Sequence, residues 1–148
     1  MDVEEVVKLF KSIGAKCKKL RRREIYSCWK DGVRAVIDPE DITITDVGEF
    51  REEYLHLETE DGWRDLEIED TVSNLIGGKF RIEIRGDVNL KATFPIDRAE
   101  DAVKLFNYLA ENEVWMAATN MDGELRIRKG KEAIGGDEFI EDIEKLFS

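Results

Sequence analysis

The feature that most constrains the fold is a run of about eighty residues with alternating apolar and polar side chains, flanked by stretches with apolar residues at helical spacing. The helical spacing predicts helices at 2–13, 97–111 and 136–147. The alternation predicts an antiparallel sheet with one buried face and one solvated face. We therefore expect an α+β fold: a meander-like sheet of about six to eight strands, with an N-terminal helix, a middle helix and a C-terminal helix packed on it.

Short turn signals divide the alternating run into strands. Asp31-Gly32 predicts a two-residue hairpin turn, which places Tyr26 and Cys28 on the same face as three apolar residues of the next strand, Val33, Ala35 and Ile37. Trp29 would then lie opposite Arg34.

Later strands follow the same logic. Phe80, Ile82 and Ile84 point to one face, and the alternating charged residues point to the other, namely Lys79, Arg81, Glu83 and Arg85. The alternation also predicts one strand that contains Leu55 and Leu57 and another that contains Leu66 and Ile68. We expect a mobile loop at 71–78.

The chain reads as a single compact domain over residues 1–148. Its length fits one domain, it has only two prolines, and no Ser- or Pro-rich linker divides it. Two similar segments, Val7-Lys8-Leu9-Phe10 and Val103-Lys104-Leu105-Phe106, each precede an alternating pair. Their similarity is explained either by duplication of a helix-and-hairpin unit or by convergence of two short amphipathic helices.

Two cysteines are too few for a disulfide-rich secreted scaffold. If residues 15–20 pair with 25–30, Cys17 lies directly opposite Cys28. A disulfide is then possible, and we expect reduced, packed thiols, because cytoplasmic proteins rarely hold disulfides.

The compartment is expected to be cytoplasmic. The first residues are acidic where a signal peptide would be positively charged, and no apolar run is long enough to span a membrane. The chain contains no glutamine and is rich in Lys, Arg and Glu, which is a thermophile-like composition.

Charge is distributed unevenly along the chain. The net charge is −11, which argues against a basic nucleic-acid coat protein. Residues 1–34 carry ten basic and five acidic groups, whereas residues 35–74 carry two basic and fourteen acidic groups. Such an asymmetry favours a partner-binding role.

The candidate binding site is a basic run with two neighbouring aromatic residues: Lys16, Lys18, Lys19, Arg21, Arg22, Arg23, Tyr26 and Trp29. The lysines and arginines could bind phosphates, and the aromatic rings could supply stacking surfaces. The alternative interpretation is that this run pairs with the acidic segment, within one chain or between two copies.

Acidic residues between 49 and 70 give a weaker metal hypothesis. Hard cations need several oxygens converging on one point, and the spacing here matches no calcium-binding loop. His56 is the only histidine, and no serine or cysteine can be assigned beside it as a nucleophile. Gly77-Gly78-Lys79 lacks the rest of a phosphate-loop pattern and is interpreted as a turn that enters the Phe80 strand.

Element order gives two resemblances. Residues 41–111 resemble the second half of a pleckstrin-homology-like barrel, with strands followed by a helix after Phe94-Pro95. The helix–sheet–helix order of the whole chain is similar to that of small acidic chaperones of bacterial secretion systems. These resemblances imply binding of a lipid head group or of a partner protein.

We therefore expect a small, acidic, non-enzymatic protein without a cofactor that mediates protein–protein interaction or oligomerisation. Its expected partner is another protein or a second copy of itself. The first alternative is nucleic-acid or phosphate-ligand binding through Lys16–Arg23, and the second is a metal-dependent hydrolase on the acidic face.

Overall fold

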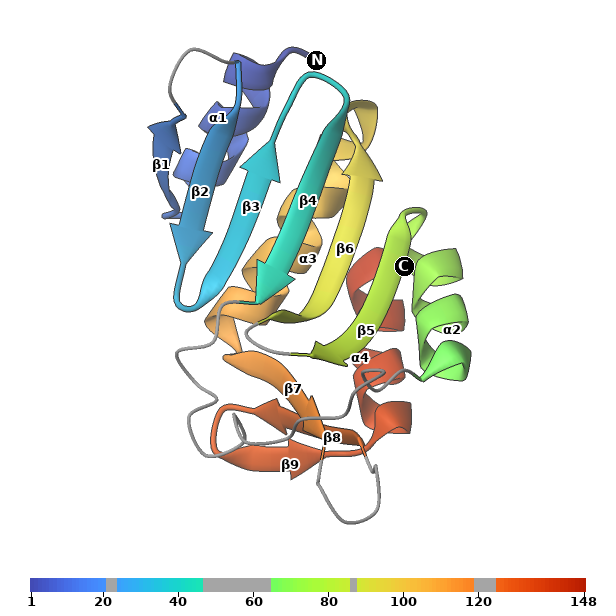
Figure 1. Ribbon diagram of the computed structural model, residues 1–148. Coiled ribbons are helices and arrows are strands. Elements are labelled where there is room, and N and C mark those ends of the chain that lie inside the picture. Colours follow the sequence, from blue (N-terminus) through green and yellow to red (C-terminus); the bar gives the residue numbers. More distant parts are fainter. Residues whose placement is uncertain (21–23, 47–64, 86–87, 119–124) are drawn as a thin grey trace.

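The computed structural model (Figure 1) describes residues 1–20, 24–46, 65–85, 88–118 and 125–148. Within them the predicted α+β fold class is confirmed. The helices are α1 (Val3–Ser12), α2 (Leu66–Ile76), α3 (Ala99–Glu111) and α4 (Gly136–Phe147), with a 3-10 turn η3 (Ile96–Arg98) before α3. The strands are β1 (Lys16–Lys19), β2 (Tyr26–Lys30), β3 (Val33–Ile37), β4 (Asp41–Asp46), β5 (Lys79–Arg85), β6 (Val88–Pro95), β7 (Val114–Ala118), β8 (Leu125–Lys129) and β9 (Glu132–Ile134).

The larger sheet has six antiparallel strands in the order β1-β2-β3-β4-β6-β5. The first four strands follow one another as a meander. After that, β6 pairs with β4, and β5 forms the edge of the sheet. A second sheet, β7-β8-β9, contains the antiparallel pair β7–β8 and one further short strand.

The predicted faces of the large sheet are confirmed where the structure describes them. Cys28, Ala35 and Ile37 are buried on one face, and β4, β5 and β6 add Ile42, Ile44, Phe80, Ile82, Ala92 and Phe94 to it. Helices α1 and α3 cover this face, as Figure 1 shows, and Phe139 of α4 contacts Phe80. The side chains of residues 83–85 lie outside the described part.

The two similar sequence segments meet in the core. Phe10 of α1 and Phe106 of α3 pack edge to face, with ring centroids 4.9 Å apart. Both rings are fully buried. Each helix is followed by an antiparallel hairpin, β1–β2 after α1 and β7–β8 after α3. The helix-and-hairpin correspondence that the sequence indicated is therefore present in the fold.

Two local predictions between β4 and β5 are wrong. Leu66 and Ile68 belong to helix α2 rather than to a strand, and this helix continues through most of the expected loop at 71–78. Asp65 starts the helix, since its side chain accepts a hydrogen bond from the backbone N–H of Ile68 at 3.1 Å. Gly77 ends it in the left-handed conformation, with φ of 68°. The expected strand at Leu55–Leu57 lies outside the described residues.

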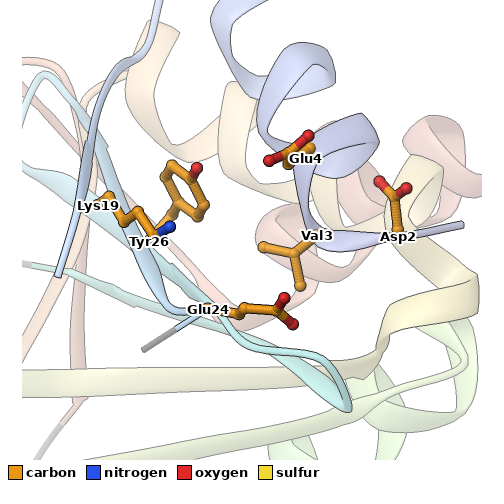
Figure 2. Close-up of a pocket in the computed structure, with 6 residues that line it drawn as sticks. All are labelled: Asp2, Val3, Glu4, Lys19, Glu24 and Tyr26. Carbon is orange, nitrogen blue, oxygen red and sulfur yellow. The ribbon is translucent and has the colours of Figure 1, made fainter. Parts of the chain in front are cut away.

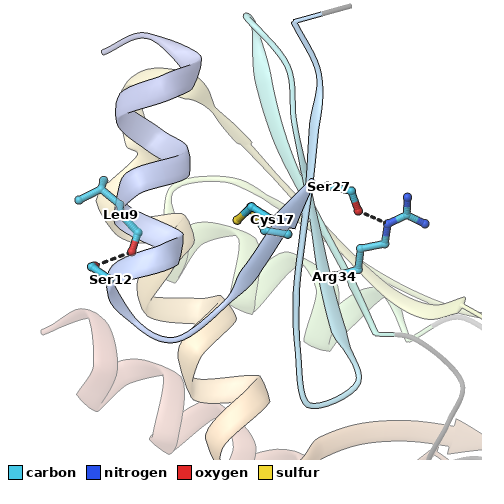
Figure 3. The surroundings of a disulfide bond; sticks show 6 residues. Leu9, Ser12, Cys17, Ser27 and Arg34 are labelled. Atoms are coloured by element: carbon cyan, nitrogen blue, oxygen red, sulfur yellow. Dashed lines mark hydrogen bonds between the residues drawn. A yellow bond between two sulfur atoms is a disulfide. The ribbon is translucent and has the colours of Figure 1, made fainter. Parts of the chain in front are cut away.

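The predicted register of the first hairpin is confirmed, and the expected state of its thiols is wrong. Cys17 lies directly opposite Cys28, and a disulfide joins the two residues. Figure 3 shows Cys17 on the α1 side of the sheet, with Ser27 and Arg34 on the opposite side. The two paired strands lie close enough to bring the sulfur atoms within bonding distance. The expectation of reduced thiols rested on the cellular compartment and did not take this geometry into account.

Candidate functional site

None of the described helices lies in front of one face of the large sheet, as Figure 1 shows for β1–β4 and β6. We call this the open face. The register of the strands assigns its described side chains, which are Lys16, Lys18, Ser27, Trp29, Arg34, Val36, Asp41, Thr43, Thr45, Lys79, Arg81, Lys91, Thr93 and Pro95. Six of these residues are basic, and one, Asp41 at the end of β4, is acidic.

The open face contains part of the predicted basic site. Lys16 and Lys18 of β1 are exposed there, and Trp29 of β2 is 41% exposed opposite Lys16. On its other side Trp29 faces Arg34, as the sequence predicted. The Nε atom of Arg34 donates a 2.8 Å hydrogen bond to the Ser27 hydroxyl, which holds the guanidinium against the sheet (Figure 3).

Two other predicted site residues point away from the open face. Lys19 and Tyr26 lie on the Cys17–Cys28 side of the hairpin and line a pocket of about 300 Å³ beside the start of α1. Figure 2 shows this pocket, which Asp2, Glu4 and Glu24 also line. Among the described residues that line it, three are acidic and one, Lys19, is basic, so this described part of the pocket does not extend the basic site. Arg21, Arg22 and Arg23 lie outside the described residues.

The sequence-based site omitted the basic residues of the other sheet edge. Lys79 and Arg81 of β5 and Lys91 of β6 line a hollow of about 70 Å³ together with Thr93. Arg81 lies directly opposite Lys91, and Lys79 lies opposite Thr93. The outward alternation of Lys79 and Arg81 was visible in the sequence. The signal that was missing is the pairing that brings Lys91 beside them.

The helical side of the molecule has the opposite charge. The four helices together contain thirteen acidic and four basic residues. They lie behind or beside the sheet in Figure 1, away from the open face. The described part of the chain therefore has a basic sheet face and an acidic helical layer. This asymmetry differs from the one along the sequence, because ten of the thirteen acidic helical residues lie outside residues 35–74.

The acidic stretch lies largely outside the described residues, as does His56. Of its described members, Asp65 caps α2, Glu67 and Asp70 are exposed, and Glu69 is buried. Within the described part of the chain, no three His, Cys, Asp or Glu side chains gather where they could hold a metal ion.

Two titratable side chains with displaced pKa values form a structural contact. Tyr108 of α3 donates a 2.8 Å hydrogen bond to Oδ2 of Asp142 in α4, which also accepts a 2.8 Å bond from Lys129 of β8. Burial, together with Asp142, raises the pKa of Tyr108 above its usual range. Burial also disfavours the charged form of Asp142, but the hydrogen bonds from Lys129 and Tyr108 outweigh it and lower the pKa of that carboxyl. Tyr108 therefore remains a protonated donor to Asp142, and the Asp142 carboxylate joins α3, β8 and α4.

The described helices include none with the length and apolar character needed to cross a bilayer. No protein-family model, curated protein or solved structure matches this chain. The two resemblances in element order therefore gain no support from these comparisons, and a function has to be argued from the open face itself.

Proposed function

We propose that this protein is a non-enzymatic binding module whose open face binds an acidic partner protein. The observation that carries the proposal is the separation of charge between the two layers. Among the described side chains, six basic residues and one acidic residue face outward from the sheet, while the described helices are strongly acidic. Such a separation attracts an acidic surface to one face and repels it from the other, so it also orients the encounter.

The open face combines its charges with apolar contact area. Trp29 is 41% exposed and lies between Lys16 and Arg34, and Val36 is partly exposed beside Ser27. Tryptophan and arginine are the residues that most often dominate the energy of protein interfaces. Because Arg34 is held by Ser27, it loses less conformational freedom when a partner binds.

Net charge alone does not argue against an acidic partner. The chain has a net charge of −11, but electrostatic screening in physiological salt limits each charge to a range of about 8 Å. A partner in contact with the sheet therefore experiences mainly the basic side chains of the open face. A cytoplasmic location stays a prediction of the sequence.

The test uses a glutamate-rich peptide and a lysine-rich peptide of equal length as probes, with fluorescence anisotropy of the full chain as the readout. We expect saturable binding of the acidic peptide that weakens as salt rises. The double variant Lys16→Gln/Lys18→Gln should bind it several-fold more weakly. The matched control Lys8→Gln/Lys11→Gln removes the same charge from exposed positions on α1 and should leave the affinity unchanged. Equal losses in both variants, or no binding of the acidic peptide, would overturn the proposal.

Nucleic acid is the second candidate, and Trp29 is the observation that favours it. An exposed aromatic ring between two cations is the arrangement on which single-stranded bases stack. A single-stranded oligothymidylate is therefore included as a third probe. If it binds more tightly than the acidic peptide and Trp29→Ala abolishes that binding, the partner is nucleic acid and the protein-binding proposal fails.

A second copy of the chain could also supply an acidic surface through its helices. Light scattering at low and high salt measures the oligomeric state directly. If the chain forms a salt-sensitive oligomer that Lys16→Gln/Lys18→Gln dissociates, the open face binds a second copy of the chain and the proposal of a separate partner fails. A monomer at all salt concentrations supports a separate partner.

A further inference from the structure

The basic hollow at the β5 edge has a composition that sets it apart from the rest of the open face. It measures about 70 Å³, and of the four described residues that line it three are cationic: Lys79, Arg81 and Lys91. The fourth, Thr93, contributes a hydroxyl group. Together they form a two-by-two arrangement, with Lys79 opposite Thr93 and Arg81 opposite Lys91.

Two features of the hollow are unfavourable in the absence of an anion. Like charges placed directly opposite each other in an antiparallel pair repel, and Arg81 and Lys91 are such a pair. In addition, the Nε atom of Arg81 is buried and finds no hydrogen-bond acceptor among the described residues. A buried donor without a partner is destabilising, so an acceptor supplied by a ligand would be bound favourably.

We propose that this hollow binds a tetrahedral oxyanion of the phosphate class. A phosphate monoester carries close to two negative charges and three free oxygens, which can accept hydrogen bonds from several donors at once. The two lysines, the Arg81 guanidinium and the Thr93 hydroxyl surround a space suited to one such group. A carboxylate has one charge and two oxygens, so it would leave part of this donor set unused.

The site shares the open face with the proposed function, because Lys79, Arg81 and Lys91 are three of its six described basic residues. Phosphate binding is nevertheless tested by its own probe. A phosphate group could reach the hollow as free inorganic phosphate or as part of a phosphorylated side chain, and both present the same chemistry. The hollow lies at the β5 edge, whereas Lys16 and Lys18 lie on β1 at the opposite edge. Substitution of Lys16 and Lys18 therefore tests binding of an acidic protein without changing the residues of the hollow.

The experiment records amide chemical shifts of the full, isotope-labelled chain during titration with inorganic phosphate, with sodium acetate at equal ionic strength as the reference. We expect saturable shifts at residues 79–81 and 91–93 with phosphate and weaker ones with acetate. A phosphoserine peptide and its unphosphorylated counterpart form a second arm. Tighter binding of the phosphopeptide than of inorganic phosphate identifies a phosphorylated side chain as the source, and the reverse identifies the free ion.

The variants decide whether the hollow is responsible. Lys79→Gln/Lys91→Gln changes two exposed side chains and should weaken phosphate binding at least tenfold. Arg81→Lys keeps the charge but removes the Nε donor, so it should weaken binding to a smaller extent. Lys16→Gln/Lys18→Gln is the matched control and should retain the affinity. Shifts no larger than those with acetate, or an equal loss in the control, would overturn the site whatever the result with acidic peptides.

Discussion

Arg81 of β5 lies directly opposite Lys91 of β6, and both side chains are on the open face of the sheet. Two cations in this position repel each other, and the cost in a sheet is about 0.2–1 kcal/mol. Because β5 is the edge of the described sheet, no described strand lies on its outer side to contribute a compensating carboxylate. The fold therefore keeps a locally unfavourable pair of charges on the open face.

Replacing one member of this pair by an acid should stabilise the protein. In phosphate-free buffer at low salt, Lys91→Glu should raise the free energy of unfolding by about 0.5 kcal/mol, because an opposed pair of opposite charges replaces repulsion with attraction. Urea denaturation measures the change, and high salt should reduce it. Lys16→Glu is the control, since Lys16 faces Trp29 rather than a charge. A lower stability for Lys91→Glu than for the control would contradict the interpretation.

The disulfide between Cys17 and Cys28 should contribute a large share of the stability of the first hairpin. It closes a short loop, with a sequence separation of 11, so its loss is expected to lower the free energy of unfolding by about 2–3 kcal/mol. The double variant Cys17→Ala/Cys28→Ala and reduction of the natural protein should give similar losses in denaturant unfolding. Reductant should have no effect on the double variant. A natural chain whose mass does not change on reduction would show that the thiols are free.

Local patterns predicted most of the elements, and the exception shows their limit. Residues Leu66 to Glu69 alternate between apolar and acidic, which is typical of a strand, yet they form the first turn of α2. Four residues cannot separate the two periods. The helix is indicated by the four-residue spacing of Val72 and Ile76, which are both buried, and by Gly77, where the helix ends. Reading the window over eleven residues rather than four would have identified the helix.

The sequence identified only part of the basic open face, and the reason differs from the one given for α2. The run from Lys16 to Arg23 is conspicuous because its charges are adjacent in sequence. The hollow joins Lys79 and Arg81 to Lys91 through strand pairing, and the sheet order β4-β6-β5 decides which residues lie beside it. That order depends on long-range packing, which alternation within each strand does not encode. Alternation also sends Lys19 to the face opposite Lys16 and Lys18, which a count of basic residues ignores.

Gly78 should be intolerant of a side chain. A Cβ atom at this position would lie 2.7 Å from the backbone oxygen of Thr93, which cannot move without disturbing the β5–β6 pairing. Gly78→Ala should therefore lower the free energy of unfolding by about 1–3 kcal/mol, measured by denaturant unfolding. Gly135→Ser is a suitable comparison, because no atom lies within 4 Å of the added Cβ and serine is a good cap for α4. It should leave stability unchanged or raise it, and equal losses in both variants would refute the steric explanation.

Asp142 should make the stability of the protein sensitive to acid. Hydrogen bonds from Lys129 and Tyr108 outweigh the effect of burial and hold the pKa of this carboxyl below its usual value. A carboxyl whose pKa is lower in the folded state than in the unfolded state stabilises the fold at neutral pH. This contribution is lost as the pH falls below about 4, the unfolded value, toward the lower folded value.

Asp142→Asn should therefore cost about 1–2 kcal/mol of unfolding free energy at pH 7, because it weakens two hydrogen bonds to a charged group. The difference from the natural protein should shrink as the pH approaches 2. Tyr108→Phe removes one of the two donors and should raise the pKa of Asp142 toward its usual value, which carbon-13 NMR of the carboxyl can follow. Glu141→Gln changes an exposed neighbour on α4 and serves as the control. A stability difference for Asp142→Asn that is the same at pH 7 and at pH 2 would show that the ionised carboxyl is not what joins α3, β8 and α4.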